Sequence, residues 1–295
     1  MATLRAYLGV ARAPFLLLPV TLVAAGAAAA AFGGVFSWPR TALAVLGLVA
    51  AHVGVNVLNE ASDMRTGIDL HTERTPFSGG SGTLPGQAMS LRTATIFGLL
   101  ACAVALAIGV WFVTQVGWIL VPVLAAGAVA ILLYTDVFAR AGVGELVAGL
   151  GLGALPVWGS ALVQGGAPGP GAFAAAVPAF FMTFDLLLLN EFPDERPDRL
   201  GGRRNLVLRL GRRAAARVYA GAAIAVPTAI LVAVAMRVLP LHAALAVLPS
   251  LLLVRPLGWA FGDTGRPVPV PALAANVTWN LATNALLAAG LVLAR

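Results

Sequence analysis

Long stretches without a charged side chain constrain this sequence more than any other feature. Residues 93–135 and 146–184 contain no Asp, Glu, Lys or Arg. A membrane-spanning helix needs about 20 mostly apolar residues, so each stretch is long enough for two helices. Only 11% of all residues are charged and 60% are hydrophobic, whereas about a quarter of a soluble domain is charged. We therefore expect a membrane protein with several spans.

Turn signals divide the apolar stretches into nine predicted spans. Gln115 and Gly117 favour a turn in the first long stretch, and the glycine- and proline-rich residues 164–171 interrupt the second. Only helices and closed barrels satisfy their backbone groups in lipid, and these runs are too long and too uniformly apolar for barrel strands. The sequence predicts an all-α integral membrane protein, with residues 1–295 forming one membrane-embedded domain, a nine-transmembrane-helix bundle. The other apolar runs lie at about 13–36, 41–59, 214–236, 238–254 and 269–294.

The arginines predict the orientation of these spans. The sequence contains no lysine, and nine spans place every arginine except Arg40, Arg237 and Arg295 on the side of the N-terminus. The positive-inside rule assigns that side to the cytoplasm. The two long loops, at about 60–91 and 191–213, lie on the same side. We expect a multi-pass protein of the cell membrane whose active site faces the cytoplasm beneath cap loops.

Composition also excludes some classes of site and partner. The single cysteine, Cys102, cannot form an intramolecular disulfide or a cysteine-based zinc site. The arginines are scattered over short loops, which argues against nucleic acid as a partner, and no feature implies a protein partner. His52 and His242 fall within predicted spans, where a polar side chain commonly contacts a neighbouring helix.

Both long loops begin with the same short motif, Leu-Asn-Glu-x-x-Asp, at residues 58–63 and 189–194. Helical spacing places the polar residues of each motif region on one face, although Pro193 and Pro197 are expected to loosen the second helix. Polar side chains at membrane depth are costly unless they face a partner or a wet cavity. The two faces are therefore predicted to meet across a cavity open to the cytoplasm. Their residues are Asn56, Asn59 and Asp63 in the first region, about 56–73, and Asn190, Asp194 and Asp198 in the second, about 190–204.

Clustered carboxylates and amides predict a magnesium site. They are hard oxygen ligands, and without a nearby Cys or His cluster they suit Mg²⁺ better than zinc. Mg²⁺ usually keeps several waters and connects protein carboxylates to substrate phosphates. Guanidinium groups, which match phosphate oxygens in pairs, are interleaved with the acids. Together these groups predict a pyrophosphate clamp. The interleaved arginines are Arg65, Arg74, Arg196, Arg199, Arg203 and Arg204.

Three segments resemble a known family. They are Asn56-x-x-Asn59-Glu60-x-x-Asp63-x-x-x-Gly67-x-Asp69, then Tyr134-Thr135 with Arg140-x-Gly142-x-Gly144-Glu145, and Asn190-x-x-x-Asp194-x-x-x-Asp198-x-x-x-Gly202-x-Arg204-x-Leu206 with Leu210-Gly211. In this combination they are similar to the UbiA superfamily of intramembrane prenyltransferases, and closest to its 1,4-dihydroxy-2-naphthoate (menaquinone-pathway) branch. The resemblance covers most of the chain and implies a UbiA-type bundle with Mg²⁺ holding a prenyl diphosphate.

The resemblance also implies roles for individual residues. Its catalytic metal-site acids match Asp63, Asp194 and Asp198, with Asn59, Glu60 and Asn190 as further metal ligands. Arg65, Arg140 and Arg204 stand where the family places basic residues near the diphosphate, and the interleaved Arg74 joins them as a candidate. Two departures are Glu60, where many members have Asp, and arginine in place of every lysine. The candidate pocket residues are Asn56, which lies on the first polar face, and three aromatic residues whose rings can stabilise a cation. The aromatic residues are Tyr134, Trp158 and Phe184.

The predicted activity is Mg²⁺-dependent transfer of an isoprenoid from a prenyl diphosphate to an aromatic acceptor, a quinone precursor such as 1,4-dihydroxy-2-naphthoate. Such an enzyme transfers alkyl groups other than methyl. The general base stays open between Asp63, Glu60 and His71. The loop at residues 75–82 can close as a lid or aim backbone N–H groups at an anion. Alternatives are a UbiA-type terpene cyclase, transfer to a porphyrin-type ring and, from a different class, a secondary transporter.

Overall fold

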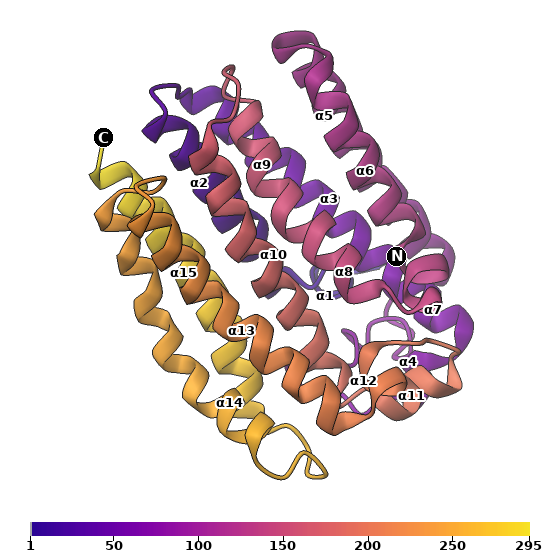
Figure 1. The fold of residues 1–295 in the computed structure, drawn as a ribbon. Helices are drawn as coiled ribbons and strands as arrows, with labels where there is room; N and C mark the ends of the chain where they lie inside the picture. The colour runs from indigo at the N-terminus through magenta and orange to yellow at the C-terminus, as the bar shows by residue number, and fades with distance from the viewer. Residues whose placement is uncertain (1) are drawn as a thin grey trace.

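The computed structural model describes residues 2–295, and every regular element in that range is a helix (Figure 1). Six long helices run without interruption, and all of them are rich in apolar residues. Three further spans are assembled from shorter helical pieces. The six are α2 (Leu17–Phe32), α3 (Trp38–Thr66), α5 (Leu91–Val116), α10 (Pro170–Glu191), α13 (Arg212–Ala235) and α15 (Val270–Leu293).

The three assembled spans change helix type part-way, which fits their content of glycine and proline. Each pairs an α-helix with a tighter 3₁₀ or wider π segment, and π segments often occur at functional sites. One of them, η3, carries Tyr134 of the predicted pocket. The pieces are η2 (Trp118–Leu120), α6 (Val121–Leu133), η3 (Tyr134–Phe138) and α7 (Ala139–Ala141); α8 (Gly144–Gly149), η4 (Leu150–Ala154) and α9 (Leu155–Leu162); and η5 (Leu241–Leu253) and α14 (Val254–Phe261).

Eight helices of the described chain are long and apolar enough to cross a membrane. They correspond to the first eight predicted spans, and the predicted turns occur at Gly117, which has a φ of 85°, and between Leu162 and Pro170. The ninth predicted span corresponds to α15, which packs against η5 and α2 but carries three asparagines and is not one of the eight. The membrane bundle is confirmed, and the ninth crossing stays a prediction.

Small residues allow the helices to pack closely, as is usual where lipid replaces water. A Cβ added at Gly26 of α2 would clash with the carbonyl oxygen of Val157 in α9. A Cβ at Gly54 of α3 would clash with the sulfur of Cys102 in α5. The central helices α2, α10, α13 and α15 share one apolar core, whereas α5 and α6 expose many large apolar side chains on the outside of the bundle.

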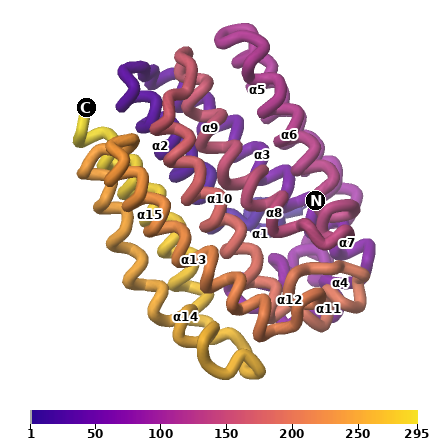
Figure 2. Tube along the Cα trace, in the orientation of Figure 1, coloured from indigo at the N-terminus to yellow at the C-terminus, as the bar shows by residue number. Residues whose placement is uncertain are grey.

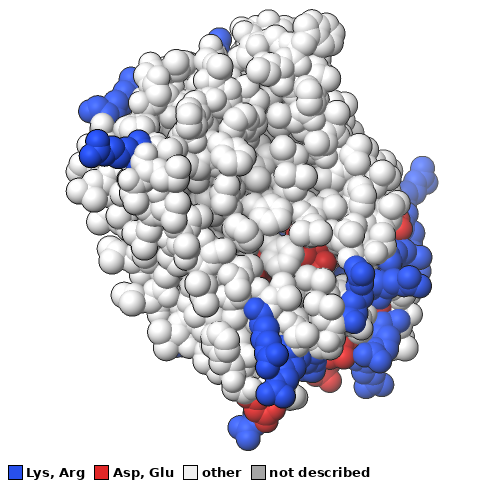
Figure 3. All heavy atoms as spheres, in the orientation of Figure 1, with Lys and Arg blue, Asp and Glu red and all other residues white. Residues whose placement is uncertain are grey.

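Charged residues gather at one end of the bundle (Figure 3). This end holds the short helices α4 (Ile68–His71), α7, α11 (Glu195–Leu200) and α12 (Leu206–Leu210), as Figures 1 and 2 show. The C-terminus lies at the opposite end, where few charges are visible. The two long loops therefore meet at a single polar end of an otherwise apolar molecule.

Candidate active site

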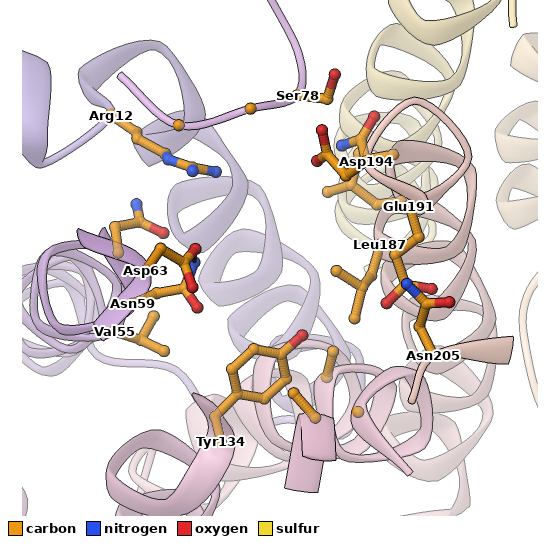
Figure 4. Close-up of a pocket in the computed structure, with 18 of the residues that line it drawn as sticks. Arg12, Val55, Asn59, Asp63, Ser78, Tyr134, Leu187, Glu191, Asp194 and Asn205 are labelled. Atoms are coloured by element: carbon orange, nitrogen blue, oxygen red, sulfur yellow. Dashed lines mark hydrogen bonds between the residues drawn. The ribbon is translucent and has the colours of Figure 1, made fainter. Parts of the chain in front are cut away.

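Both polar motifs open into one cavity at the charged end of the bundle. The cavity has a volume of about 190 Å³ and is lined from α3, α10, α11, η3 and the loop after α4. Asn59 and Asp63 lie on one wall and Asp194 on the opposite wall, with Tyr134 beneath them (Figure 4). The arrangement predicted from helical spacing, two polar faces across a cavity, matches this geometry.

The first wall is the last part of α3, which continues as a regular helix to Thr66. The helix ends where Gly67 adopts a φ of 81°, a left-handed conformation that glycine takes without strain. Asn59 and Asp63 lie one turn apart, and the Asn59 amide donates to the Asp63 carboxylate at 3.3 Å. The hydroxyl of Thr135 donates to Asn59 Oδ1 at 3.0 Å, which fixes the amide orientation.

The second wall is interrupted, as the expected loosening of the helix at Pro193 implies. Helix α10 ends at Glu191 and α11 begins at Glu195, because Pro193 has no N–H to continue the ladder. Asp194 occupies the N-cap position of α11 without a capping hydrogen bond from its side chain, and Asn190, Asp194 and Asp198 all line the cavity.

Arg203 connects the two walls. Its guanidinium forms ion pairs with Asp63 and with Asp198, the latter at 3.1 Å, and donates to Asn59 Oδ1 at 3.2 Å. Asn205 donates to the other Asp198 oxygen at 2.8 Å. One arginine thus holds together residues more than 130 positions apart in the sequence.

The sequence pointed to the neighbouring arginine instead. Arg204 matched the family pattern and was the predicted diphosphate ligand, whereas Arg203 was noted only as one of the interleaved arginines. In the structure Arg203 lines the cavity and Arg204 is exposed. The backbone of Arg203 is tied to the Asp198 carbonyl and that of Arg204 to the Ala139 carbonyl, so the two side chains point to different sides. Only this tertiary pairing distinguishes them.

Burial and like charge shift the titration of the cavity acids outside the membrane spans. Burial raises the pKa of Asp69 to about 7, and the negative charges of Asp63 and Glu60 add to the effect. Burial likewise raises the pKa of Asp194 to about 7, with Asp198 adding to it and Arg203 opposing it. Burial alone would lower the pKa of Arg203, but Asp63 and Asp198 raise it above its ordinary value. Six acidic side chains but only two arginines line the cavity, which is consistent with like charges adding to these raised pKa values.

Glu60, the predicted metal ligand whose family position departs from the pattern, faces away from the cavity lining. One of its oxygens accepts from Arg12 Nε at 3.1 Å and from the Ser81 backbone N–H at 2.7 Å. The other oxygen accepts from the Ser81 hydroxyl at 2.6 Å. Glu60 is fully buried in these contacts, and it fastens the loop at residues 75–82 to α3. Arg12, which no motif identified, lines the cavity beside it.

The loop fastened in this way covers the cavity. Ser78, Gly79 and Gly80 line it (Figure 4 shows Ser78), and Gly79 and Gly80 have φ values of 82° and 72°. A Cβ at Gly80 would lie 3.0 Å from the Asp69 carboxylate, so glycine lets the backbone approach the acids. The loop therefore lies over the cavity, and its role as a lid or an anion-binding loop stays a prediction.

Other candidates predicted from sequence divide into two groups. Asn56 and Tyr134 line the cavity. The four predicted diphosphate arginines are exposed. Trp158 packs against Phe173, and Phe184 packs against Phe180. None of the four arginines and neither of these two aromatic residues lines the cavity, so their roles stay predictions. Of the three candidate bases, Asp63 lines the cavity, while Glu60 is fastened to the loop and His71 is exposed. The four arginines are Arg65, Arg74, Arg140 and Arg204.

The donors of the cavity fit Mg²⁺. They are carboxylate and amide oxygens, and buried oxygens of Asp69, Glu191 and Asp194 have no hydrogen-bond partner within residues 2–295. In the same range no three His, Cys, Asp or Glu side chains lie close enough together to enclose a metal ion. Acids spaced in this way suit an ion that keeps some waters and shares its shell with a substrate phosphate, which is how Mg²⁺ usually binds.

A family model for the UbiA prenyltransferase family matches residues 17–268. The chain belongs to this family. The match includes both motif regions and all of the cavity walls except Arg12 and Phe15. The chain is accordingly a prenyltransferase, an enzyme that transfers alkyl groups other than methyl. A comparison with curated proteins gives no significant match.

Solved structures share this fold at low sequence identity. A UbiA homolog from Archaeoglobus fulgidus bound to GPP and Mg²⁺ has a TM-score of 0.70 and 16% identity, with 97% of this chain and 99% of that chain covered. An apo UbiA homolog from Aeropyrum pernix K1 has a TM-score of 0.67 and 17% identity, covering 94% and 97%. A digeranylgeranylglyceryl phosphate synthase has a TM-score of 0.65 and 13% identity, covering 98% and 97%. The UbiA-type fold is therefore confirmed over nearly the whole chain.

Proposed function

We propose that this enzyme transfers an isoprenoid chain from a prenyl diphosphate to an aromatic acceptor, a quinone precursor such as 1,4-dihydroxy-2-naphthoate. We further propose that it does so in the cell membrane with the active site facing the cytoplasm. The observation that carries the proposal is the cavity itself, in which two acidic motifs face each other, Arg203 bridges them and Arg12 also lines the space. The gathering of charge at this end supports the orientation.

Asp63, Asp194 and Asp198 are the residues that would hold Mg²⁺, with Asn59 and Asn190 as further oxygen donors. When bound, Mg²⁺ supplies positive charge that stabilises the leaving diphosphate. The UbiA homolog from Archaeoglobus fulgidus was solved with GPP and Mg²⁺, which supports the same pairing here. The amide and carboxylate oxygens described above match the ligand preference of this ion.

The arginines act on the diphosphate directly. Arg203 is held by two carboxylates, yet its buried Nε has no hydrogen-bond partner within the described chain and remains able to donate. Arg12 is oriented by Glu60 and lines the same space. As the allylic C–O bond breaks, negative charge grows on the diphosphate oxygens, and donors already fixed in place stabilise it without reorganisation.

The membrane end of the cavity protects the allylic cation. Apolar side chains line it below the acids, including Leu152, Leu186 and Leu187, and exclude water that would otherwise capture the cation. The Tyr134 ring lies beneath the polar groups (Figure 4), where its face can stabilise positive charge. An electron-rich ring carbon then attacks the cation and loses its proton to a base, for which Asp63 is a candidate in the cavity.

The experiment is a product assay that distinguishes a transferase from a cyclase. Membranes containing the protein are incubated with Mg²⁺ and a radiolabelled prenyl diphosphate, with and without a panel of aromatic acids. A transferase leaves the diphosphate largely intact until an acceptor is added and then forms a prenylated ring, with hydroxylated naphthoate preferred. Rapid formation of a cyclic hydrocarbon from the diphosphate alone contradicts the proposal and supports a cyclase.

A further inference from the structure

A second cavity adjoins the first one deeper in the bundle. It has a volume of about 280 Å³, lies between α3, α5, α6 and α9, and is lined almost entirely by aliphatic and small side chains. His52 and Leu152 line both cavities. Leu106 and Leu132, which also line it, are each 55% exposed on the outside of α5 and α6. His52 and Leu152 therefore form the boundary between the two cavities, and the second cavity lies beneath the apolar outer surface of the bundle.

His52 stands at the junction with one nitrogen unused. Its Nδ1 lies 3.0 Å from the backbone oxygen of Leu48. A carbonyl oxygen only accepts, so Nδ1 carries the hydrogen. An uncompensated charge at this depth is costly, so the ring is neutral and Nε2 is an acceptor. His52 is 4% exposed, and within residues 2–295 its buried Nε2 has no hydrogen-bond partner.

The position of His52 relates it to the diphosphate site. His52, Asn56 and Asn59 follow one another along α3 at intervals of four and three residues, on one face of the helix. The rise of a helix places His52 about 6 Å below Asn56 and about 10 Å below Asn59. A ring held at His52 thus lies just beneath the end of the cavity where the allylic carbon would be released.

We propose that the second cavity receives the aromatic acceptor and that His52 Nε2 accepts a hydrogen bond from a ring hydroxyl group. This inference rests on the proposed function. The unpartnered acceptor selects this occupant, because a buried acceptor without a donor destabilises the protein and a hydroxylated ring supplies the donor. An isoprenoid tail or a lipid acyl chain has no N–H or O–H group and would leave Nε2 unpaired. His52 is then a specificity-determining residue for the second substrate.

The test measures binding without turnover. Detergent-solubilised protein, without Mg²⁺ or diphosphate, is titrated calorimetrically with 4-hydroxy-2-naphthoate and with 2-naphthoate, which lacks the hydroxyl group. The wild type is expected to bind the hydroxylated compound about fivefold more tightly, the effect of one neutral hydrogen bond. In His52→Leu this ratio should fall to about one, and in His52→Gln, whose amide oxygen can accept, part of it should return. His242→Leu, at an exposed histidine on η5, should keep the wild-type ratio.

Several outcomes overturn the inference. They are a wild-type ratio near one, a ratio unchanged by His52→Leu, or no measurable binding of either compound to the wild type. If His52→Leu instead weakens prenyl diphosphate binding while the naphthoate ratio persists, the second cavity holds the isoprenoid tail. The product assay of the wild type separates this failure from failure of the proposed function, since that assay does not depend on His52 variants.

Discussion

Replacing Arg203 by Met tests whether this arginine holds the two motif walls together before substrate binds. Arg203→Met keeps much of the side-chain volume and removes the charge. It breaks the ion pairs to Asp63 and Asp198 at once. The Arg203 side chain is 17% exposed, and those of Asp63 and Asp198 are 6% and 2% exposed, so water screens these pairs weakly.

The expected loss of stability is large because two carboxylates lose a common partner. Removing one member of a buried ion pair costs about 3–5 kcal/mol, which corresponds to a fall in melting temperature on the order of 10 °C. Protonation limits the loss. Burial already raises the pKa of Asp198, and without Arg203 that pKa rises further. A carboxyl group with a raised pKa destabilises the fold only while it is charged. The difference in melting temperature between the wild type and Arg203→Met should therefore be greater at pH 8 than at pH 6.

The assay is thermal unfolding of the purified protein in detergent without substrate. Mg²⁺ should raise the melting temperature of Arg203→Met more than that of the wild type, because the two acids are then free to bind a cation. The matched control is Arg204→Met at the adjacent exposed position, which should melt close to the wild type. An Arg203→Met protein that melts within about 2 °C of the control, with an equal response to Mg²⁺, would refute the reasoning.

Three further predictions concern the loop, the metal and the orientation. Because Glu60 accepts hydrogen bonds from Ser81, Glu60→Gln should make the loop after α4 more sensitive to limited proteolysis and leave the Mg²⁺ requirement unchanged. A tenfold higher Mg²⁺ requirement would instead identify Glu60 as a metal ligand. The raised pKa of Asp194, about 7, means that protons compete with Mg²⁺ for this carboxylate below pH 7. Half-maximal turnover should therefore need about tenfold more Mg²⁺ at pH 6 than at pH 8. Equal Mg²⁺ requirements at the two pH values would contradict a role of Asp194 in binding the metal. A cysteine at Gly202 should react with an impermeant reagent only from the cytoplasmic side and one at Gly169 only from the other; labelling of both from one side would contradict the nine-span arrangement.

The helices and the meeting of the motifs could be predicted because they follow from local properties of the sequence. Uncharged runs of sufficient length specify spans in lipid, and fixed helical spacing puts Asn59 and Asp63 on one face. The break between Glu191 and Glu195 follows from Pro193, as predicted, and Asp194 faces the cavity as its spacing predicted.

The choice of cationic partner could not be predicted, because it depends on contacts between distant segments. Arg203 and Arg204 are adjacent and chemically identical, and they differ only in the backbone contacts that turn one toward Asp63. Arg12 lies far from both motifs in sequence and reaches the cavity through its pairing with Glu60. The free nitrogen of His52 is likewise a property of packing, since the sequence alone is equally consistent with a helix-packing histidine.

The most direct test of the central claim is the turnover of Asp63→Asn and Asp194→Asn at saturating Mg²⁺. The two substitutions lie on opposite walls of the cavity and remove one charge each with little change in shape. If both walls hold the metal and diphosphate, each variant should remain folded and lose at least about 100-fold in turnover, on the order of 2.7 kcal/mol of transition-state stabilisation. Near-normal turnover by either variant would contradict the claim, because that wall would then contribute nothing to the reaction.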